Sequence, residues 1–375
     1  FFFKQKTAYE IVDCDWSSDV CSSDLLSSIE KKYRLNIWQL AINERIFYRF
    51  YDFYKFTASE ILSIDEQACR LFEEIFDEVN PDFIAIKEPA FHHLEMFYRM
   101  SRAQGIKILM LSYSSLAGKS LICQESNTMD FIDNLDTVEY SKRDFSKLQN
   151  YLKSFDISKS IRTADIKHGN SKLQTIRAAM EFFFSLNNKN METNYNYYGR
   201  TKFKVFTQLL GAIIKKRYRK YFIDQNLIKN SDLKFPFVYF PLGVDLERNL
   251  LINAPFFNNQ IEIIRHIVKS LPPGYALCVK ENPSQSTREW RKISEYKEIL
   301  DIPNIKLLHP EFPKEELLSK CSLVVTITGT SGLEGTSYGK PSIVFADVGY
   351  SILSSVFRCR EPEKLSELRS EEHTS

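Results

Sequence analysis

Short apolar runs alternate with amphipathic segments from residue 235 onward, and this alternation constrains the fold most strongly. Parallel strands need a crossover connection, usually a helix, so the pattern predicts an α/β fold with a parallel sheet. Continuous Val, Leu and Ile runs are typical of a doubly wound, Rossmann-like sheet that is buried on both faces. The predicted strands are 235–242, 275–280, 305–308, 322–327 and 342–346, and the predicted helices are 258–270, 288–299, 313–320 and one that starts near Ser331.

A weaker alternation of the same kind lies in the first half of the chain. Residues 66–79 have the periodicity of an amphipathic helix that ends at Asn80-Pro81, and a short apolar run follows at 82–86. A second helix that ends at Gly105 and a strand over 106–111 complete the unit. The length and the two alternating regions predict two α/β domains rather than one.

The two ends of the chain differ from the rest. The DNA word AGATCGGAAGAGCACACGTCT encodes residues 369–375, and its reverse complement encodes the segment that runs from Ser18 into Leu25. This word matches a short-read library adapter, and residues 4–11 match the outer part of the same adapter. We therefore expect residues 1–25 and 369–375 to be artefactual adapter translation, outside the folded protein.

Composition excludes several classes of protein. The chain has 50 basic and 48 acidic residues, but three of the basic and seven of the acidic ones lie in the two ends. The remaining 343 residues have a net charge of +6, too modest for a nucleic-acid binder without a recognition motif. Their five cysteines show no CxxC pair and no ligand spacing to histidine, which argues against a zinc site or a disulfide framework and favours a reducing cytosol. No apolar run approaches the ~18 residues that a membrane-spanning helix needs.

The stretch TITGTSGLEGTSYGKP, residues 326–341, combines a strand end with small and hydroxyl-bearing residues at a predicted helix start. It is neither a G-x-G-x-x-G motif nor a Walker A motif. Exposed N–H groups, hydroxyls and the helix dipole would favour a phosphate there, while Glu334 could accept from ribose hydroxyls. The alternative is that a Thr or Ser only caps the helix. The candidate phosphate ligands are Thr328, Gly329, Thr330 and Ser331.

Several landmarks in residues 235–347 occur in a characteristic order. A Pro-Leu strand end is followed by Glu247-Arg248, by Gln260 in the next helix, and by Leu-Pro-Pro-Gly. Val-Lys-Glu-x-Pro, Thr-Gly-Thr-x-Gly-x-Glu and Gly-Lys-Pro come after them. With these motifs the segment resembles the capsule polysaccharide biosynthesis family, which includes the Kdo transferases of bacterial capsules. That group is similar in layout to GT-B glycosyltransferases.

The resemblance implies a GT-B-like fold, in which two Rossmann-like domains with parallel sheets face a cleft. An acceptor-side domain would cover residues 26–232 and a nucleotide-sugar donor domain residues 233–347, followed by a truncated C-terminal segment over 348–368. The resemblance also implies that residues 328–331 bind the donor phosphate and Glu334 the ribose. No cofactor other than the nucleotide-sugar substrate is expected, and no metal, since no D-x-D motif stands where a metal-dependent transferase would carry one.

Lys280 and Glu281 match the Lys-Glu-His-Pro loop of the family and become donor-binding candidates, but Asn282 replaces the histidine. In related enzymes that histidine contacts the nucleotide phosphate and can assist the leaving group. Asparagine can donate a hydrogen bond but cannot supply a proton. Asn282 is thus a candidate catalytic position with altered chemistry. A second departure is Gly243 in Pro-Leu-Gly, where a larger polar residue is usual.

His92 and His93 follow the predicted strand 82–86, close to Glu88. Such a group suits an acceptor site or a general base. The alternative is that these histidines pack or cap a helix. No feature of the sequence favours His93 over His92.

The predicted function is transfer of a sugar, in particular Kdo from CMP-Kdo, to a capsule or other surface polysaccharide or glycolipid acceptor. A nucleotide-sugar 2-epimerase-like enzyme and a non-catalytic partner in polysaccharide assembly or export stay open as alternatives. The expected place is the cytoplasm, with peripheral contact to the cytoplasmic face of the inner membrane as one option. The basic segment 215–220 could contact anionic lipid there, or could simply be a solvated helix face.

Overall fold

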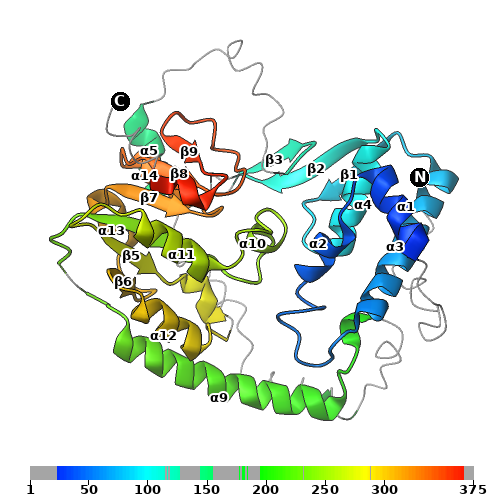
Figure 1. Cartoon of the computed structure of the whole chain (residues 1–375), viewed down its shortest axis with the longest axis horizontal. Coiled ribbons are helices and arrows are strands. Elements are labelled where there is room, and N and C mark those ends of the chain that lie inside the picture. Colours follow the sequence, from blue (N-terminus) through cyan, green and yellow to red (C-terminus); the bar gives the residue numbers. More distant parts are fainter. Residues whose placement is uncertain are drawn as a thin grey trace. The chain divides into compact units, whose positions relative to one another are not determined.

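The structure, a computed structural model, describes residues 23–114, 116, 119–126, 144–154, 177, 180–181, 184, 195–230, 232–287 and 289–366. The chain divides into two compact units, one formed by residues 1–109 and 168–211 and the other by residues 110–167 and 212–375. Helix α9 (Lys202–Asn226) runs from the first unit into the second (Figure 1). The sequence instead predicts a boundary at residue 232, which stays a prediction.

The first unit is built mainly from helices. They are α1 (Ser23–Tyr33), α2 (Ile37–Ile42), α3 (Ala58–Val79) and α4 (His92–Ala103), with the short 3-10 turn η3 (Tyr195–Tyr197). Strand β1 (Phe83–Lys87) lies between α3 and α4, as the sequence predicts, and β2 (Lys107–Tyr113) follows α4. Strand β2 is the middle strand of the sheet β1-β2-β3. Its residues from Met110 onward, and the strand β3 (Ser120–Cys123) with which they pair antiparallel, fall within the second unit.

Helix α3 is eight residues longer at its start than the sequence predicts, and its cap explains why. The Thr57 hydroxyl accepts from the Glu60 N–H while the Glu60 carboxylate accepts from the Thr57 N–H, which forms a capping box. The helix ends at Asn80, whose φ of 43° is left-handed, directly before Pro81. Buried residues of α3, including Phe72 and Phe76, pack with the Met side chains of α4 into one core.

The second unit contains a parallel six-stranded sheet in the order β6-β5-β4-β7-β8-β9. The earliest strand, β4, is central, and the order reverses beside it, as in the doubly wound nucleotide-binding fold. The α/β class and the Rossmann-like sheet that the sequence predicts are therefore confirmed. The strands are β4 (Phe237–Pro241), β5 (Ala276–Lys280), β6 (Ile305–Leu308), β7 (Leu323–Thr326), β8 (Ser342–Val344) and β9 (Val356–Arg358).

Helices cover both faces of this sheet. Successive strand residues point to opposite faces, so neighbouring residues of one strand pack against different helices. Val238 and Phe240 share one core with helices α11 and α12, whereas Phe237 and Tyr239 share another with α13. These two cores explain why the strands are continuous apolar runs rather than alternating ones. The helices are α10 (Arg248–Leu251), α11 (Gln260–Lys269), α12 (Ile293–Asp301), α13 (Lys314–Lys320) and α14 (Ser331–Ser337), with the 3-10 turns η4 (Pro283–Thr287) and η5 (Pro362–Lys364).

Two elements of this unit lie outside the sequence-based prediction. Strand β9 adds a sixth strand at the edge of the sheet. Helix α5 (Phe145–Ser154) comes from the polar middle of the chain and packs near α14, where the Gln149 amide donates to the Ser337 carbonyl at 2.8 Å. No helix within the described residues is long and apolar enough to span a membrane.

Candidate functional site

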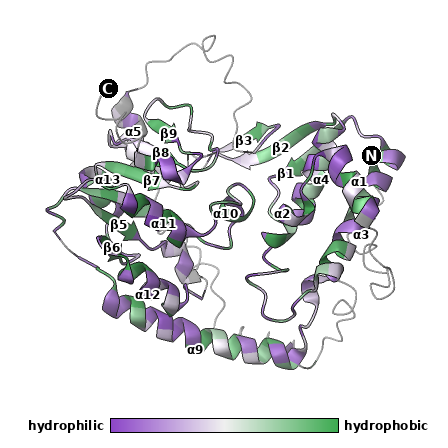
Figure 2. Ribbon diagram, viewed as in Figure 1, coloured by the Kyte–Doolittle hydropathy of each residue, from purple (hydrophilic) through white to green (hydrophobic). Residues whose placement is uncertain are grey.

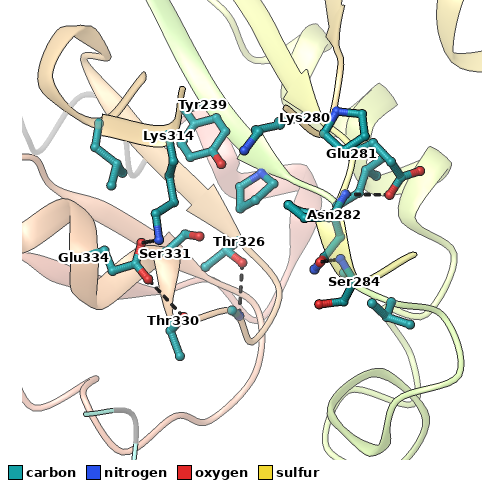
Figure 3. Close-up of a pocket in the computed structure, with 18 of the residues that line it drawn as sticks. Tyr239, Lys280, Glu281, Asn282, Ser284, Lys314, Thr326, Thr330, Ser331 and Glu334 are labelled. Carbon is teal, nitrogen blue, oxygen red and sulfur yellow. Dashed lines mark hydrogen bonds and ion pairs between the residues drawn. The ribbon is translucent and has the colours of Figure 1, made fainter. Parts of the chain in front are cut away.

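A cavity of about 850 Å³ opens beyond the carboxyl ends of β4, β5 and β7 in the second unit. This is the switch point of the sheet, where ligands bind in doubly wound folds. The volume is within the range of about 300–1,000 Å³ that is usual for small-molecule sites. Its walls come from β4, the two loops that the sequence singles out, the start of α13, and the end of α5 (Figure 3).

The turn between β7 and α14 forms one wall. The Thr326 hydroxyl accepts from the Gly329 N–H at 3.1 Å and so folds the turn back onto the strand. A Cβ on Gly329 would lie 2.7 Å from that hydroxyl oxygen, so the turn has no room for a side chain there. Thr330 occupies the N-cap position of α14 but makes no capping hydrogen bond with its side chain. The alternative in which Thr330 acts as a helix cap therefore lacks its defining contact.

The hydroxyl groups of this wall share the cavity with a buried phenol. Tyr239, a β4 residue that is 1% exposed, lines the cavity together with Ser331. Burial raises the pKa of the Tyr239 phenol, so the group keeps its proton and can donate. The predicted phosphate ligands Thr328, Gly329, Thr330 and Ser331 all line the cavity.

Glu334 lies one turn into α14 and faces the cavity with a partner that the sequence did not suggest. Its Oε2 atom is 2.8 Å from Nζ of Lys314, and its Oε1 atom accepts from the Thr330 hydroxyl at 3.4 Å. Lys314 is the first residue of α13 and also lines the cavity (Figure 3). The rule that ligands bind beyond strand ends could have pointed to it, because α13 directly follows β6.

Lys280 and Asn282 form the opposite wall. Lys280 is the last residue of β5 and is 6% exposed, so its ammonium group belongs to the cavity lining rather than to the outer surface. The side-chain oxygen of Asn282 accepts from the Ser284 N–H at 2.9 Å. Since that oxygen is occupied, the side-chain NH₂ is the group that Asn282 can offer as a donor.

Glu281 was predicted to bind the donor, but its carboxylate is completely buried and surrounded by groups of the chain itself. It accepts from Nε of Arg291 at 3.0 Å, from the Tyr296 hydroxyl at 2.7 Å and from the Asn282 N–H at 2.6 Å. Burial raises the pKa of Glu281, and these three donors partly offset that effect. The carboxylate anchors the loop that carries Lys280 and Asn282, and its role in donor binding stays a prediction.

Arg291 connects this loop to the neighbouring one. Besides Glu281, its guanidinium hydrogen-bonds to Asp245 and to the Gly243 carbonyl. The amide of Gln260 pairs with both backbone groups of Gly243, at 2.7 and 3.1 Å. Burial alone would lower the pKa of Arg291, but the two carboxylates outweigh it and raise the pKa. Sequence motifs gave no signal for Arg291, because its partners are distant in the chain.

The predicted acceptor-side residues lie in the first unit. Glu88 is half-buried after β1. His92 is buried between two carboxylates: Nδ1 is 3.1 Å from Glu44 and Nε2 is 2.9 Å from Asp65. Burial alone would lower the pKa of His92, but its hydrogen bonds to Asp65 and Glu44 raise the pKa to about 9. His92 is therefore a cation at neutral pH, enclosed in the core.

His93 has a different environment from its neighbour. Its Nδ1 atom lies 3.1 Å from the Tyr195 hydroxyl of η3. Burial and the charge of His92 lower the pKa of His93 to about 4, so the ring is neutral at pH 7. A neutral imidazole can accept a proton, although a base with so low a pKa is a weak one. The catalytic roles of His92, His93 and Glu88 stay predictions.

No group of three or more His, Cys, Asp or Glu side chains in the described part of the chain is arranged to hold a metal ion. The positive charge in the cavity is supplied by Lys280 and Lys314. Five glutamates line the same cavity, so the binding of an anion would depend on these two lysines and on the turn hydroxyls and N–H groups.

Residues 133–354 match the model of a family described as capsule polysaccharide biosynthesis protein. The match covers more than half of the chain and includes the whole stretch in which the motif landmarks occur. The chain belongs to this family. The family resemblance that the landmarks predict is thus confirmed, and the cavity described above is the cavity of a capsule polysaccharide biosynthesis protein.

Solved structures give weaker likenesses. The β Kdo 2,7 transferase KpsC of Thermosulfurimonas dismutans is 14% identical with a TM-score of 0.28, over 39% of this chain and 45% of that one. The β Kdo 2,4 transferase KpsC of that organism is 17% identical with a TM-score of 0.26, over 40% and 50%. The UDP-GlcNAc 2-epimerase of Methanocaldococcus jannaschii is 12% identical with a TM-score of 0.31, over 92% and 82%. The chain spans about half the length of the two KpsC chains, and no curated protein matches it.

Proposed function

We propose that this chain is a glycosyltransferase that moves a sugar from a nucleotide-sugar donor to a capsule or other surface polysaccharide or glycolipid acceptor. The observation that carries the proposal is the cavity at the switch point of the second unit, with Lys280 and Lys314 facing a turn rich in hydroxyl and N–H donors. Membership of the capsule polysaccharide biosynthesis family supports the choice of acceptor.

In this proposal the donor phosphate is bound by residues 328–331 and by Lys280. Glu334 accepts from the ribose hydroxyls, and Lys314 moves from its ion pair with Glu334 towards the phosphate. The two ammonium groups and the turn donors then stabilise the charge that develops on the departing nucleotide. The chain's own cations would do this work, so we propose a metal-independent reaction.

Asn282 shapes the chemistry that we propose at the leaving group. A nucleotide phosphate departs as a stable anion, so positive charge and hydrogen bonds can assist its departure without a proton. The Asn282 NH₂ group can supply such a hydrogen bond, because its side-chain oxygen is already engaged with Ser284. CMP-Kdo, whose nucleotide is a monophosphate, is the donor that we propose first.

We place the acceptor in the first unit, with Glu88 and His93 as candidates for contact with its hydroxyl group. His92 is too deeply buried to touch an acceptor, so we assign it the task of holding the start of α4 in place. Its partner Glu44 also accepts from the His92 N–H at 2.8 Å, which joins the same carboxylate to the helix start. The reaction would take place in the cytoplasm, at the cytoplasmic face of the inner membrane.

An assay of the full chain with CMP-Kdo tests this proposal. We expect CMP release that depends on an added saccharide or glycolipid acceptor. Products from the donor alone would favour a 2-epimerase-like enzyme instead. If nucleotide binds but CMP release requires the substitution Asn282→His, the chain is a non-catalytic partner in assembly or export.

A further inference from the structure

Helix α9 contacts the second unit through Arg219, Phe222 and Ile223, which have the i, i+3, i+4 spacing of one helix face. Ile223 is 1% exposed and belongs to the main core of this unit. Figure 2 shows hydrophobic and hydrophilic residues mixed along α9 where it passes α12. Besides attaching the helix, Arg219 and Phe222 each begin a path of contacts that leads to the wall of the cavity.

The first path runs from Phe222 through Tyr296 to the carboxylate of Glu281. The Phe222 ring stacks on the Tyr296 ring at a centroid distance of 6.3 Å and an interplanar angle of 25°. The Tyr296 hydroxyl donates to Oε2 of Glu281 at 2.7 Å. The other carboxylate oxygen, Oε1, accepts from the Asn282 N–H at 2.6 Å. Two side chains thus connect Phe222 to the backbone of a residue that lines the cavity.

The second path starts at Arg219, whose side chain is 15% exposed. Its guanidinium donates to the carbonyl groups of Glu289 and Trp290 at 3.1 and 2.9 Å. Trp290 has a φ of 64°, a left-handed conformation that a bulky residue keeps only where its surroundings hold it. The next residue, Arg291, donates from Nε to Oε2 of Glu281 at 3.0 Å. Arg219 therefore holds the backbone from which Arg291 reaches the cavity wall.

Both paths end on one atom, Oε2 of Glu281. We propose that α9 positions residues 280–284, which we call the Lys280 loop, and that Arg219 is a positioning residue for ligand binding in the cavity. The Lys280 loop presents Lys280 and Asn282 to the cavity, whereas Arg219 and Phe222 lie outside its lining. Only the identity of the ligand, a nucleotide, rests on the proposed function.

The burial of Glu281 favours positioning over simple attachment of the helix. Its carboxylate is 0% exposed, so water cannot replace a donor that is lost, and the Lys280 loop would have to rearrange. If the contacts only attached α9, loss of Arg219 would loosen the helix and leave the loop unchanged. Helix α9 begins in the first unit, so the two paths connect the Lys280 loop to a helix that both units share.

Hydrogen exchange of the full chain without ligand tests the proposal, read by mass spectrometry over peptides that cover residues 281–287. We expect Arg219→Ala to accelerate exchange there about tenfold, because the Asn282 N–H depends on the Glu281 carboxylate. Exchange in β4 should stay unchanged. Arg219→Lys keeps a cationic donor and should restore part of the protection. Tyr296→Phe keeps the ring but removes the hydroxyl, and should accelerate exchange to a similar extent.

Arg217→Ala is the matched control, because Arg217 is exposed and lies on the other side of α9 from Arg219. It should change neither the exchange nor the nucleotide affinity. Arg219→Ala should weaken nucleotide binding about fivefold in a titration of the same proteins.

Unchanged exchange in residues 281–287 of the Arg219→Ala variant would overturn the proposal. An equal acceleration in β4 would also overturn it, because that result means a general loss of stability. So would an unchanged nucleotide affinity of Arg219→Ala in a chain that binds nucleotide. Faster exchange of the Lys280 loop in a chain that binds no nucleotide would support the positioning by α9 and contradict the proposed function instead.

Discussion

The two units each contain a cluster of charged residues, and the clusters differ in what they face. In the first unit His92 lies between Glu44 and Asp65, all three at most 4% exposed. In the second unit Lys280, Lys314 and Glu334 face a cavity of about 850 Å³. The first cluster is closed off from solvent, although Glu44 Oε1 and Asp65 Oδ2 accept no hydrogen bond from the residues that the structure describes, whereas the second has open space in which a ligand can compete for its charges.

This difference indicates which charged residues support the fold and which are placed to bind a ligand. A buried ion pair adds little net stability, but removal of one partner is costly because the other charge stays in the core. The Glu281–Arg291–Asp245 network behind the cavity wall resembles the first cluster in this respect. We therefore expect substitutions in closed clusters to affect folding, and substitutions on the cavity surface to affect binding.

The largest effect should come from His92→Ala. The substitution leaves Glu44 and Asp65 buried without their shared cation, so the free energy of unfolding should fall by about 3–5 kcal/mol. Urea denaturation of the full chain measures this. His93→Gln is the control, because it removes the contact with Tyr195 and the ring contacts with Phe91 and His92 but leaves both buried carboxylates paired with His92, and it should cost about 1 kcal/mol. If the His92→Ala variant kept its stability and lost only activity, His92 would be catalytic, and the closed cluster of the first unit would not be purely structural.

Arg291→Met should be nearly as damaging. It removes the cation shared by Glu281 and Asp245, and we expect a loss of about 3 kcal/mol in the free energy of unfolding. Nucleotide affinity should fall as well, since the loops that carry Gly243 and Lys280 lose their link. Arg291→Lys keeps the charge and should recover part of the stability. If the Arg291→Met variant and the wild-type protein had equal free energies of unfolding, the Glu281–Arg291–Asp245 network would not contribute to the stability of the fold.

The pH dependence of stability should show the His92 cluster directly. The folded pKa of about 9 lies above the ordinary value of 6.5, so protonation of His92 favours the folded state. Its contribution is fully present below about pH 6.5 and is lost as the pH rises through about 9, with an expected size of about 3 kcal/mol. Denaturation midpoints between these pH values measure it. In a His92→Gln variant the free energy of unfolding should no longer fall between these pH values. If it fell as steeply as in the wild-type protein, the raised pKa of His92 would not be the cause.

The smallest effect should be that of Lys314→Gln. Lys314 is partly exposed, so loss of its charge should leave folding unchanged and weaken nucleotide binding about fivefold, or about 1 kcal/mol. Lys320→Gln, at the other end of α13, is the matched control and should leave binding unchanged. If Lys314→Gln lowered the free energy of unfolding but left the nucleotide affinity unchanged, the Lys314–Glu334 pair would support the fold rather than bind the nucleotide.

The sheet of the second unit could be predicted from the sequence because its strands are buried on both faces and its helices are amphipathic. The turn at residues 328–331 and Lys280 could be placed because the turn follows β7 and Lys280 ends β5, and the carboxyl ends of these strands share one edge of the sheet. Partnerships across the chain could not be predicted. His92 meets carboxylates 48 and 27 residues away, and Glu281 is turned inward by an arginine 10 residues on. Such contacts depend on how helices pack, which local periodicity does not specify.

The central claim is that the cavity of the second unit binds the nucleotide of a sugar donor, and isothermal titration of the full chain with CMP, UDP and GDP tests it most directly. We predict one-site binding of at least one nucleotide, with CMP the first candidate. The double substitution Lys280→Gln and Lys314→Gln should weaken that binding at least tenfold while the circular dichroism spectrum stays unchanged. Absence of binding by all three nucleotides to the folded chain, or equal affinity in the double variant, would contradict the claim.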